Sequence, residues 1–203
     1  MTNKLALATS LGKKLVAHYG RPNKFITWYC APRKLSGAWL TAPWCAMFAS
    51  YVFTSAGLKK EAGQFAYCPS WVNWLKKQKR WGSTPKVGAL VFYDWGGDGQ
   101  ADHVGIVTKV GKTSIKSLEG NTKRGGASNW VAEPTRQRNG TILGYGYVDV
   151  GKSKRIYTVR KGDSLSKIAK IYDTTWQILY AENRDVIGGK ASLIRPGMVL
   201  DIP

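Results

Sequence analysis

The sequence of 203 residues predicts an α+β fold in which helices pack on an antiparallel sheet and a small βααβ unit follows. Apolar residues at helical spacing come first, and strand-like runs separated by glycine-containing turns come after them. A polar connector at residues 151–156 then separates a larger unit, residues 1–150, from a smaller one, residues 157–203. With 43% hydrophobic residues, nine Trp and ten Tyr, the chain can build a core in each unit.

The first expected element is an amphipathic helix over residues 3–19, because apolar side chains recur there on one helical face. These side chains are Leu5, Ala8, Leu11, Leu15 and Tyr19. His18 lies in the same segment, where a histidine is more often a partly exposed surface residue than a catalyst.

The next expected helix begins beside a cysteine, Cys45. Pro43 suits the first turn of a helix, and Gly57 suits its C-terminal end. A cysteine in a first helical turn faces unpaired backbone N–H groups and the positive end of the helix dipole. Both favour the thiolate, which is the reactive form. Taken alone, Cys45 is equally consistent with a small buried hydrophobic residue.

The other two cysteines, Cys30 and Cys68, belong to no C-x-x-C pair, so a structural zinc site is not expected. An odd number of cysteines argues against a disulfide framework. We expect both to be buried and reduced. We also expect residues 67–75 to begin a short helix rather than to form part of an active site.

A second candidate catalytic residue, His103, opens the strand-like run at residues 103–110. A residue at a strand end beside a loop is held by a rigid element and still reaches a cleft. Histidine is uncharged near neutrality and can shuttle a proton, so His103 is the candidate base for Cys45.

A third group should accept a hydrogen bond from the imidazole and hold its orientation. The sequence predicts a hairpin turn at residues 110–113 and a strand to Glu119. A strict two-residue loop would place His103 opposite Gly120 and direct Glu119 and Asn121 to the wrong face. We therefore expect an odd-length loop or a one-residue bulge that turns Glu119 or Asn121 toward the histidine.

Three segments, Pro43–Phe48, Ala101–Val107 and Leu118–Asn121, resemble in this order the motifs of the CHAP family of cysteine, histidine-dependent amidohydrolases and peptidases. The resemblance covers about residues 1–149. It implies a papain-like fold and cleavage of amide bonds in peptidoglycan. The roles it implies are Cys45 as nucleophile, His103 as base, Glu119 as its orienting partner and Asn121 as an assisting residue.

No metal or cofactor is expected. Some members of the family carry a calcium loop before the cysteine, but residues 24–44 contain no carboxylate, so that site does not carry over. The acidic segment at residues 94–102 lacks the alternate ligand spacing and the closing Glu of a calcium loop. We expect it to form a tight turn with Asp94, Asp98 and Asp102, and metal binding by these carboxylates is the alternative.

The smaller unit is expected to follow the order βααβ. A strand at residues 156–160 leads to a Gly-Asp turn in which Asp163 or Ser164 caps a helix. A second short helix spans residues 175–183, and the unit ends in a strand. The apolar face of the first helix comprises Leu165, Ile168, Ala169 and Tyr172.

Residues 157–203 resemble a LysM module through Tyr157–Val159, Lys161–Leu165, Glu182–Asn183 and Ile194–Gly197. Members bind N-acetylglucosamine-containing glycans in a shallow groove between the first strand–helix loop and the last helix–strand loop. The groove implied by the match comprises Gly162, Asp163, Ser164, Leu165, Ile194, Arg195, Pro196 and Gly197.

The formal net charge is +19, with 21 Lys and Arg against 7 Asp and Glu over residues 1–150, and 10 against 5 afterwards. Such a charge fits anionic wall polymers or nucleic acid. No sequence motif for specific nucleic-acid binding occurs, so the wall is favoured. No apolar run approaches the ~20 residues that span a bilayer. We expect a monomer.

The expected function is a peptidoglycan hydrolase, with N-acetylmuramoyl-L-alanine amidase favoured over an endopeptidase of the same mechanism. A non-catalytic wall-binding protein and a papain-like acyltransferase are the alternatives. The N-terminal segment mixes apolar and polar residues and contains Lys13 and Lys14, so it does not resemble a signal peptide. By the resemblance, we expect a phage endolysin, made in the host bacterial cytoplasm and acting on the wall after the membrane is breached.

Overall fold

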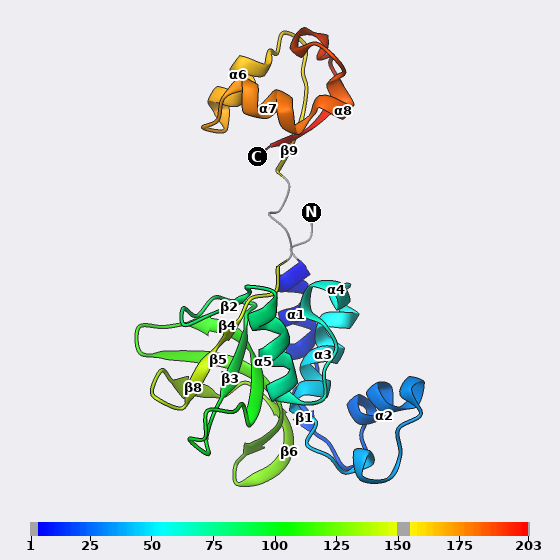
Figure 1. The fold of residues 1–203 in the computed structure, drawn as a ribbon, viewed down its shortest axis with the longest axis vertical. Helices are drawn as coiled ribbons and strands as arrows, with labels where there is room; N and C mark the ends of the chain where they lie inside the picture. The colour runs from blue at the N-terminus through cyan, green and yellow to red at the C-terminus, as the bar shows by residue number, and fades with distance from the viewer. Residues whose placement is uncertain (1–3, 150–154, 203) are drawn as a thin grey trace. The chain divides into compact units, whose positions relative to one another are not determined.

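The computed structural model describes residues 4–149 and 155–202, and the chain divides into two compact units between residues 150 and 151 (Figure 1). The predicted connector at residues 151–156 lies mostly outside the described residues. Its last part, from Arg155, belongs instead to the first strand of the second unit. None of the helices in the described ranges has the length and apolar character needed to cross a membrane.

The first unit combines helices with an antiparallel sheet. Its helices are α1 (Lys4–Lys13), α2 (Lys24–Cys30), α3 (Cys45–Ser55), α4 (Lys59–Ala62) and α5 (Cys68–Lys77), with 3-10 turns η1 (Ala31–Arg33) and η2 (Gly37–Leu40). Its strands are β1 (Ala17–His18), β2 (Trp81–Gly82), β3 (Leu90–Tyr93), β4 (His103–Val110), β5 (Ser114–Arg124), β6 (Ala127–Ala132), β7 (Thr135–Gln137) and β8 (Ile142–Gly146). The eight-stranded sheet has the order β1-β6-β5-β4-β3-β8-β2, and β7 pairs with β5.

Helix α3 is the central helix of this unit and packs against β4 and β5 (Figure 1). Because side chains alternate along a strand, Leu90 and Phe92 of β3 face the main core, whereas Val91 and Tyr93 face a smaller cluster on the opposite side of the sheet. The sheet therefore carries buried apolar side chains on both of its faces. The largest buried side chains of the main core include Trp44, Trp71, Phe25, Phe48 and Phe53.

The predicted helix over residues 3–19 is too long. Helix α1 ends at Lys13, and Ala17 and His18 form an edge strand opposite Val131 and Trp130 of β6. The backbone of this segment is hydrogen-bonded to a neighbouring strand, a tertiary contact that overrides the helical periodicity of the sequence. His18 is exposed, as expected.

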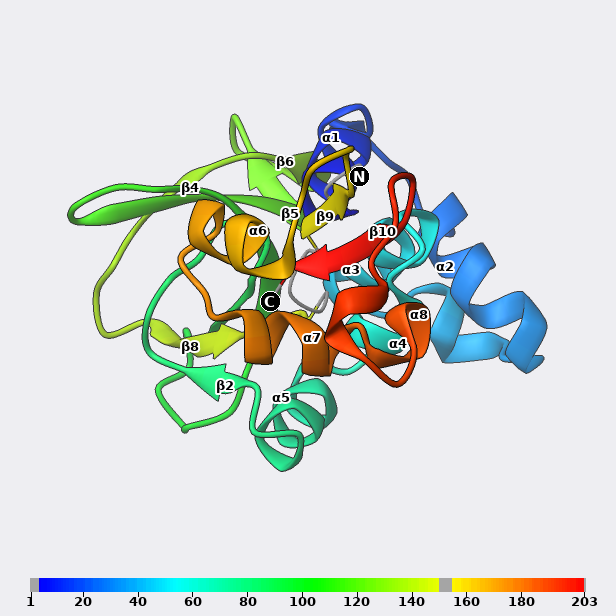
Figure 2. The same cartoon turned by 90° about the horizontal axis from the view of Figure 1, so that it is seen from above.

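The second unit has the predicted order βααβ, with an added short helix and a 3-10 turn. Its elements are β9 (Arg155–Thr158), α6 (Leu165–Ile171), α7 (Trp176–Glu182), α8 (Arg184–Ile187), η3 (Ala191–Leu193) and β10 (Val199–Ile202). Strands β9 and β10 pair in antiparallel orientation, and β10 packs against α7 (Figure 2). The side-chain hydroxyls of Ser164 and Thr175 cap α6 and α7.

The core of the second unit contains Leu165, Ile168 and Ala169, as the periodicity predicted, and Tyr172 packs against it. Asn183 connects the helices to the sheet. Its side-chain amide donates to the carbonyl oxygens of Leu179 and Asp201, and its side-chain oxygen accepts the N–H of Asp201. These hydrogen bonds of the Asn183 side chain therefore connect β10 to the C-terminal end of α7.

Candidate active site

Cys45 is the first residue of α3 and is almost completely buried. It lines a cleft of about 500 Å³ together with Trp39, Pro43, Tyr67 and Asp102. The helix begins one residue after its N-cap, Trp44, so Pro43 precedes the cap rather than lying in the first turn. The N–H groups of a first helical turn have no intrahelical partner, so the backbone here can donate to an anion.

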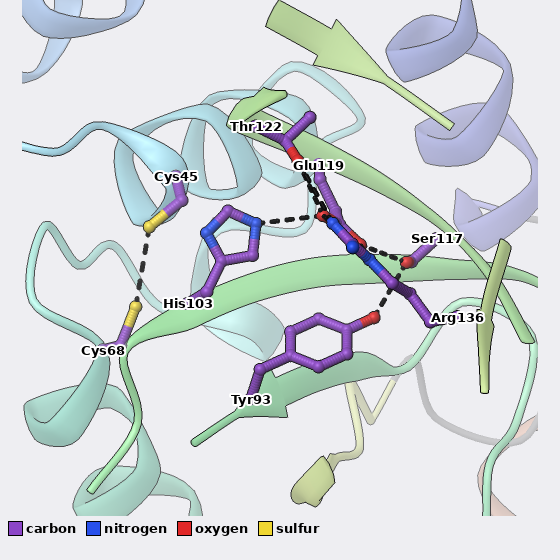
Figure 3. A network of polar contacts seen from close by, with 8 residues as sticks. All are labelled: Cys45, Cys68, Tyr93, His103, Ser117, Glu119, Thr122 and Arg136. Carbon is purple, nitrogen blue, oxygen red and sulfur yellow. Dashed lines mark hydrogen bonds and ion pairs between the residues drawn. The ribbon is translucent and has the colours of Figure 1, made fainter. Parts of the chain in front are cut away.

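His103 is the first residue of β4, and its ring lies between Cys45 and Glu119 (Figure 3). The Nε2 atom is 3.2 Å from Oε2 of Glu119. An ionised carboxylate can only accept, so Nε2 carries the proton of this hydrogen bond. The other ring nitrogen faces the sulfur of Cys45 (Figure 3). The three side chains thus form a line from thiol to imidazole to carboxylate.

The strand register explains how Glu119 reaches the histidine. Near the turn Val110 pairs with Ile115, but after a one-residue irregularity at Thr108 the pairing becomes Gly105 with Glu119. The side chains of His103 and Glu119 therefore point to the same face of the sheet. The predicted bulge is confirmed.

Gly105 makes this approach possible. A Cβ atom at this position would lie 2.9 Å from Cγ of Glu119 and 3.1 Å from Cβ of Ser117. Both contacts involve side chains in the packed interior of the sheet, where little can move. The missing side chain of Gly105 leaves the space that the Glu119 side chain occupies on its way to His103.

Glu119 is fully buried and is held by side-chain donors (Figure 3). Its Oε1 accepts from the hydroxyl of Ser117 at 2.7 Å, and its Oε2 accepts from the hydroxyl of Thr122 at 3.1 Å. The guanidinium of Arg136 donates to both oxygens, from Nε at 3.0 Å and from Nη2 at 2.5 Å. Arg136 lies on β7, and no pattern in the sequence had pointed to it.

These contacts shift the pKa values in directions that favour charge separation. Burial alone would raise the pKa of Glu119, but the hydrogen bonds from His103 and Arg136 outweigh it and lower that pKa to about 2. Burial alone would lower the pKa of His103, but the Cys45 thiolate and then Glu119 raise it to about 9.

The thiol of Cys45 is shifted in the direction that a nucleophile needs. The hydrogen bond with Cys68 lowers its pKa, burial opposes that change, and His103 and the backbone of Val104 lower it further. The pKa of Cys45 therefore lies well below its ordinary value. Together with the raised pKa of His103, this favours a thiolate–imidazolium pair at neutral pH.

The segment at residues 94–102 forms the expected tight turn. The carboxylate of Asp94 accepts the N–H groups of Gly97, Asp98 and Gly99, and that of Asp102 accepts those of Trp95 and Gly96. The turn carries Trp95 over the imidazole of His103, with ring centroids 4.8 Å apart and an interplanar angle of 23°. Trp95, another residue that sequence reasoning missed, shields the imidazole on that face.

Asn121 lies at a different position from the one its expected role requires. Its backbone has a φ of 54°, and its side-chain oxygen accepts a hydrogen bond from Nη2 of Arg21 at 2.8 Å. Of the two alternatives that the sequence left open, the structure brings Glu119 to the imidazole.

Cys68 lies in a different environment from the one predicted. Residues 67–75 do begin a helix, and both Cys68 and Cys30 are buried and free, as predicted. However, Sγ of Cys68 lies 3.8 Å from Sγ of Cys45, and both residues line the same cleft (Figure 3). The expectation that this segment lies outside the active site was wrong. The N-termini of α3 and α5 meet through tertiary packing, which no local pattern encodes.

In the second unit, the two loops of the implied glycan groove lie side by side. The N–H of Gly197 donates to the carbonyl oxygen of Val159, and Val159 leads directly into the turn that contains Gly162 and Asp163. The carboxylate of Asp163 accepts from the N–H of Arg160 and the hydroxyl of Tyr157, so it stabilises the turn. Leu165 is buried, whereas the residues at the surface of these loops are Gly162, Ser164, Arg195, Pro196 and Gly197.

Comparison with protein-family models identifies both units. Residues 37–121 match the model of the CHAP domain, and residues 157–203 match the model of the LysM domain. The CHAP match contains Cys45, His103 and Glu119 and ends before Arg136. Comparisons with curated proteins and with solved structures gave no match. The chain therefore contains a CHAP domain followed by a LysM domain.

Proposed function

We propose that this protein is a peptidoglycan hydrolase that cleaves an amide bond of the bacterial cell wall through Cys45, most simply as an N-acetylmuramoyl-L-alanine amidase. The observation that carries the proposal is the line of Cys45, His103 and Glu119 beside an open cleft. CHAP domains are generally cysteine- and histidine-dependent amidases or peptidases, and LysM domains support binding to peptidoglycan.

In the first half of the reaction, the Cys45 thiolate attacks the carbonyl carbon of the amide and forms a carbon–sulfur bond. The backbone N–H of Cys45, at the start of α3, stabilises the developing oxyanion. The imidazolium of His103 then donates its proton to the leaving nitrogen as the carbon–nitrogen bond breaks. The products of this half are a free amine and a thioester on Cys45.

In the second half, neutral His103 takes a proton from water, and the resulting hydroxide attacks the thioester. The carbon–sulfur bond breaks, which releases a carboxylic acid and restores the thiolate–imidazolium pair. Glu119 keeps its charge throughout, because its low pKa of about 2 holds it ionised while it orients the imidazole. Asn121 has no step of its own in this mechanism, because its side-chain oxygen accepts a hydrogen bond from Arg21.

The second unit is proposed to hold the enzyme on N-acetylglucosamine-containing glycan through the loops at residues 162–165 and 194–197. The net charge of +19 adds a salt-dependent attraction to anionic wall polymers. In this proposal the protein is a monomeric phage endolysin that accumulates in the host cytoplasm and reaches the wall after the membrane is breached.

The proposal is tested by turbidity loss of a bacterial cell suspension and by cleavage of soluble wall fragments. Cys45→Ala should abolish both activities, and His103→Ala should lower the rate at least ~10²-fold, the usual contribution of a positioned general base. Both variants should keep the far-ultraviolet circular dichroism and the wall affinity of the wild type. Wild-type lysis by Cys45→Ala would exclude the proposed mechanism.

Mass spectrometry of the released fragments separates the remaining possibilities. A free muramic acid lactyl group beside a free L-alanine amine identifies an amidase, and a cut within the stem or cross-bridge identifies an endopeptidase. A product that grows only when an amine is added would identify an acyltransferase. Binding without any fragment would identify a wall-binding protein.

A further inference from the structure

The two sulfur atoms in the cleft form a feature that the proposed hydrolysis does not require. Sγ of Cys45 and Sγ of Cys68 are 3.8 Å apart, close to van der Waals contact (Figure 3). Each residue opens a helix, α3 for Cys45 and α5 for Cys68, so each sulfur is carried by a well-defined backbone. Both residues line the cleft of about 500 Å³, so a small molecule in the cleft can reach them.

The third cysteine provides an internal comparison. Cys30 is also buried and free, and all three cysteines belong to the core of the first unit, but Cys30 lies at the end of α2 and is not among the residues that line the cleft. That is the ordinary environment of a structural cysteine, where the thiol behaves as a small hydrophobic group. Cys68 differs because its sulfur contacts the sulfur of the proposed nucleophile.

We propose that Cys68 is a resolving thiol, which forms a reversible disulfide with Cys45 after a hydroperoxide has oxidised the nucleophile. The inference rests on the proposed function in one respect, namely that Cys45 is present as a reactive thiolate. It adds a modification site to the cleft and names the class of molecule that modifies it.

The chemistry proceeds in two steps. The Cys45 thiolate attacks one oxygen of the hydroperoxide, the O–O bond breaks, and hydroxide or alkoxide leaves, so Cys45 becomes a sulfenic acid. The sulfur of Cys68 then attacks the sulfur of Cys45. The S–S bond forms, the S–O bond breaks, and the departing hydroxide combines with the proton of Cys68 as water. Two thiols lose two electrons, and the peroxide is reduced.

The protonation states suit these two roles. The Cys45 thiolate and burial raise the pKa of Cys68 well above its ordinary value, so Cys68 stays a thiol while Cys45 is charged. Formation of the sulfenic acid removes that negative charge, and Cys68 then loses its proton more easily. The sulfurs must approach by roughly 1.8 Å to reach the disulfide bond length, a movement on the scale of side-chain rotation.

The disulfide would have two consequences for the enzyme. It removes the thiolate, so hydrolysis stops until a thiol reductant restores it. It also protects Cys45, because a sulfenic acid without a neighbouring thiol is oxidised further to sulfinic acid, which reductants do not reverse.

The test compares the full-length wild type with Cys68→Ser and with Cys30→Ser as the matched control. Each protein is exposed to hydrogen peroxide, treated with catalase, and divided into portions with and without dithiothreitol. Intact mass and peptide mapping report the modification, and lysis is expressed relative to each protein's own untreated activity.

We expect the wild type and Cys30→Ser to lose two hydrogen atoms in mass, to yield a linked Cys45–Cys68 peptide, and to regain at least about half of their activity with dithiothreitol. Cys68→Ser should gain oxygen atoms on Cys45 and recover little. Wild-type protein that gains oxygen on Cys45 without the linked peptide would overturn the proposal.

Peptide mapping does not depend on activity or on any variant. A linked peptide in a protein that never cleaves the wall would therefore contradict the proposed function and leave the thiol pair intact. Full lysis without the linked peptide would contradict only the proposal about Cys68.

Discussion

Glu119 in the first unit and Asn183 in the second are both buried polar residues, with exposed fractions of 0% and 2%. Their partners differ in kind. Asn183 is bonded to backbone groups of Leu179 and Asp201, which belong to neighbouring elements of the fold. Glu119 is bonded to side chains, among them His103 and Arg136, which carry charge.

This difference in partners indicates that Asn183 stabilises the fold, whereas Glu119 serves catalysis. A neutral amide that satisfies backbone groups stabilises the junction of α7 and β10 at a small desolvation cost. A buried carboxylate costs much more to desolvate, and its ion pairs commonly do no more than offset that cost. Its strongly shifted pKa is typical of functional sites.

Replacing Glu119 should have the largest effect on catalysis. Glu119→Gln keeps the shape but removes the charge that orients and stabilises the imidazolium, so we expect kcat/KM on soluble fragments to fall at least ~10²-fold. The matched control is Glu133→Gln, since Glu133 forms a partly exposed ion pair with Lys13. The kcat/KM of the control variant should stay within about twofold of the wild-type value. Equal rates for both variants would mean that Glu119 is structural, like Asn183.

The pH dependence should reveal the charge state of His103. Its pKa is raised to about 9, so the imidazolium persists through neutral pH and is lost as the pH rises through that value. Since the imidazolium is the proposed acid, kcat/KM should fall about tenfold per pH unit above this point. A pH–rate profile on soluble fragments measures it. An alkaline limb near pH 6.5, the ordinary value for histidine, would contradict the buried pairing.

Removing the second unit should have a smaller effect, confined to intact cells. Deletion of residues 153–203 leaves the proposed catalytic groups and their core, so cleavage of soluble fragments should continue at the wild-type rate. Lysis should fall by several-fold, because tethering raises the effective concentration of the enzyme at the wall.

The deficit of the truncated protein should widen with ionic strength. Residues 1–150 retain 21 basic against 7 acidic side chains, a charge that attracts the domain to an anionic wall only at low salt. Lysis assays across a salt series provide the measurement. If the truncated protein lysed cells as fast as the wild type at every salt concentration, the LysM domain would be excluded as the anchor.

The smallest catalytic effect is expected from Asn183→Ala. The variant leaves backbone groups of Leu179 and Asp201 without their partner, so the unfolding free energy of the second unit should fall by about 1–3 kcal/mol. Cleavage of soluble fragments should not change. Urea unfolding followed by the fluorescence of Trp176 in the isolated second unit tests the first expectation, and a drop in soluble cleavage would contradict the separation of roles.

The helix start at Cys45 and the strand start at His103 were predictable from sequence because both depend on local patterns. The residues alone left Glu119 and Asn121 as alternatives, and the family resemblance favoured Glu119. With a regular β4–β5 hairpin, the side chains of His103 and Glu119 would lie on opposite faces of the sheet. A one-residue bulge brings them to the same face, and the structure has one at Thr108. Helix ends were harder, since α1 stops where pairing with β6 takes over.

Arg136 and Cys68 were not predictable, and for the same physical reason. Arg136 reaches Glu119 because β7 lies beside β5, and Cys68 reaches Cys45 because α5 begins next to α3. Neither residue stands in a motif, and Arg136 also lies outside the CHAP match. Contacts between elements that are distant in sequence are not encoded by any spacing within a single segment.

The close approach of Glu119 to Gly105 also gives a criterion for sorting related chains. Relatives that keep the cysteine and histidine segments but carry a larger residue in place of Gly105 would have no space for the acid to reach the imidazole. Such chains are expected to be pseudoenzymes, which retain the fold and bind the wall without cutting it. One backbone position would then distinguish lytic from non-lytic members before any protein is made.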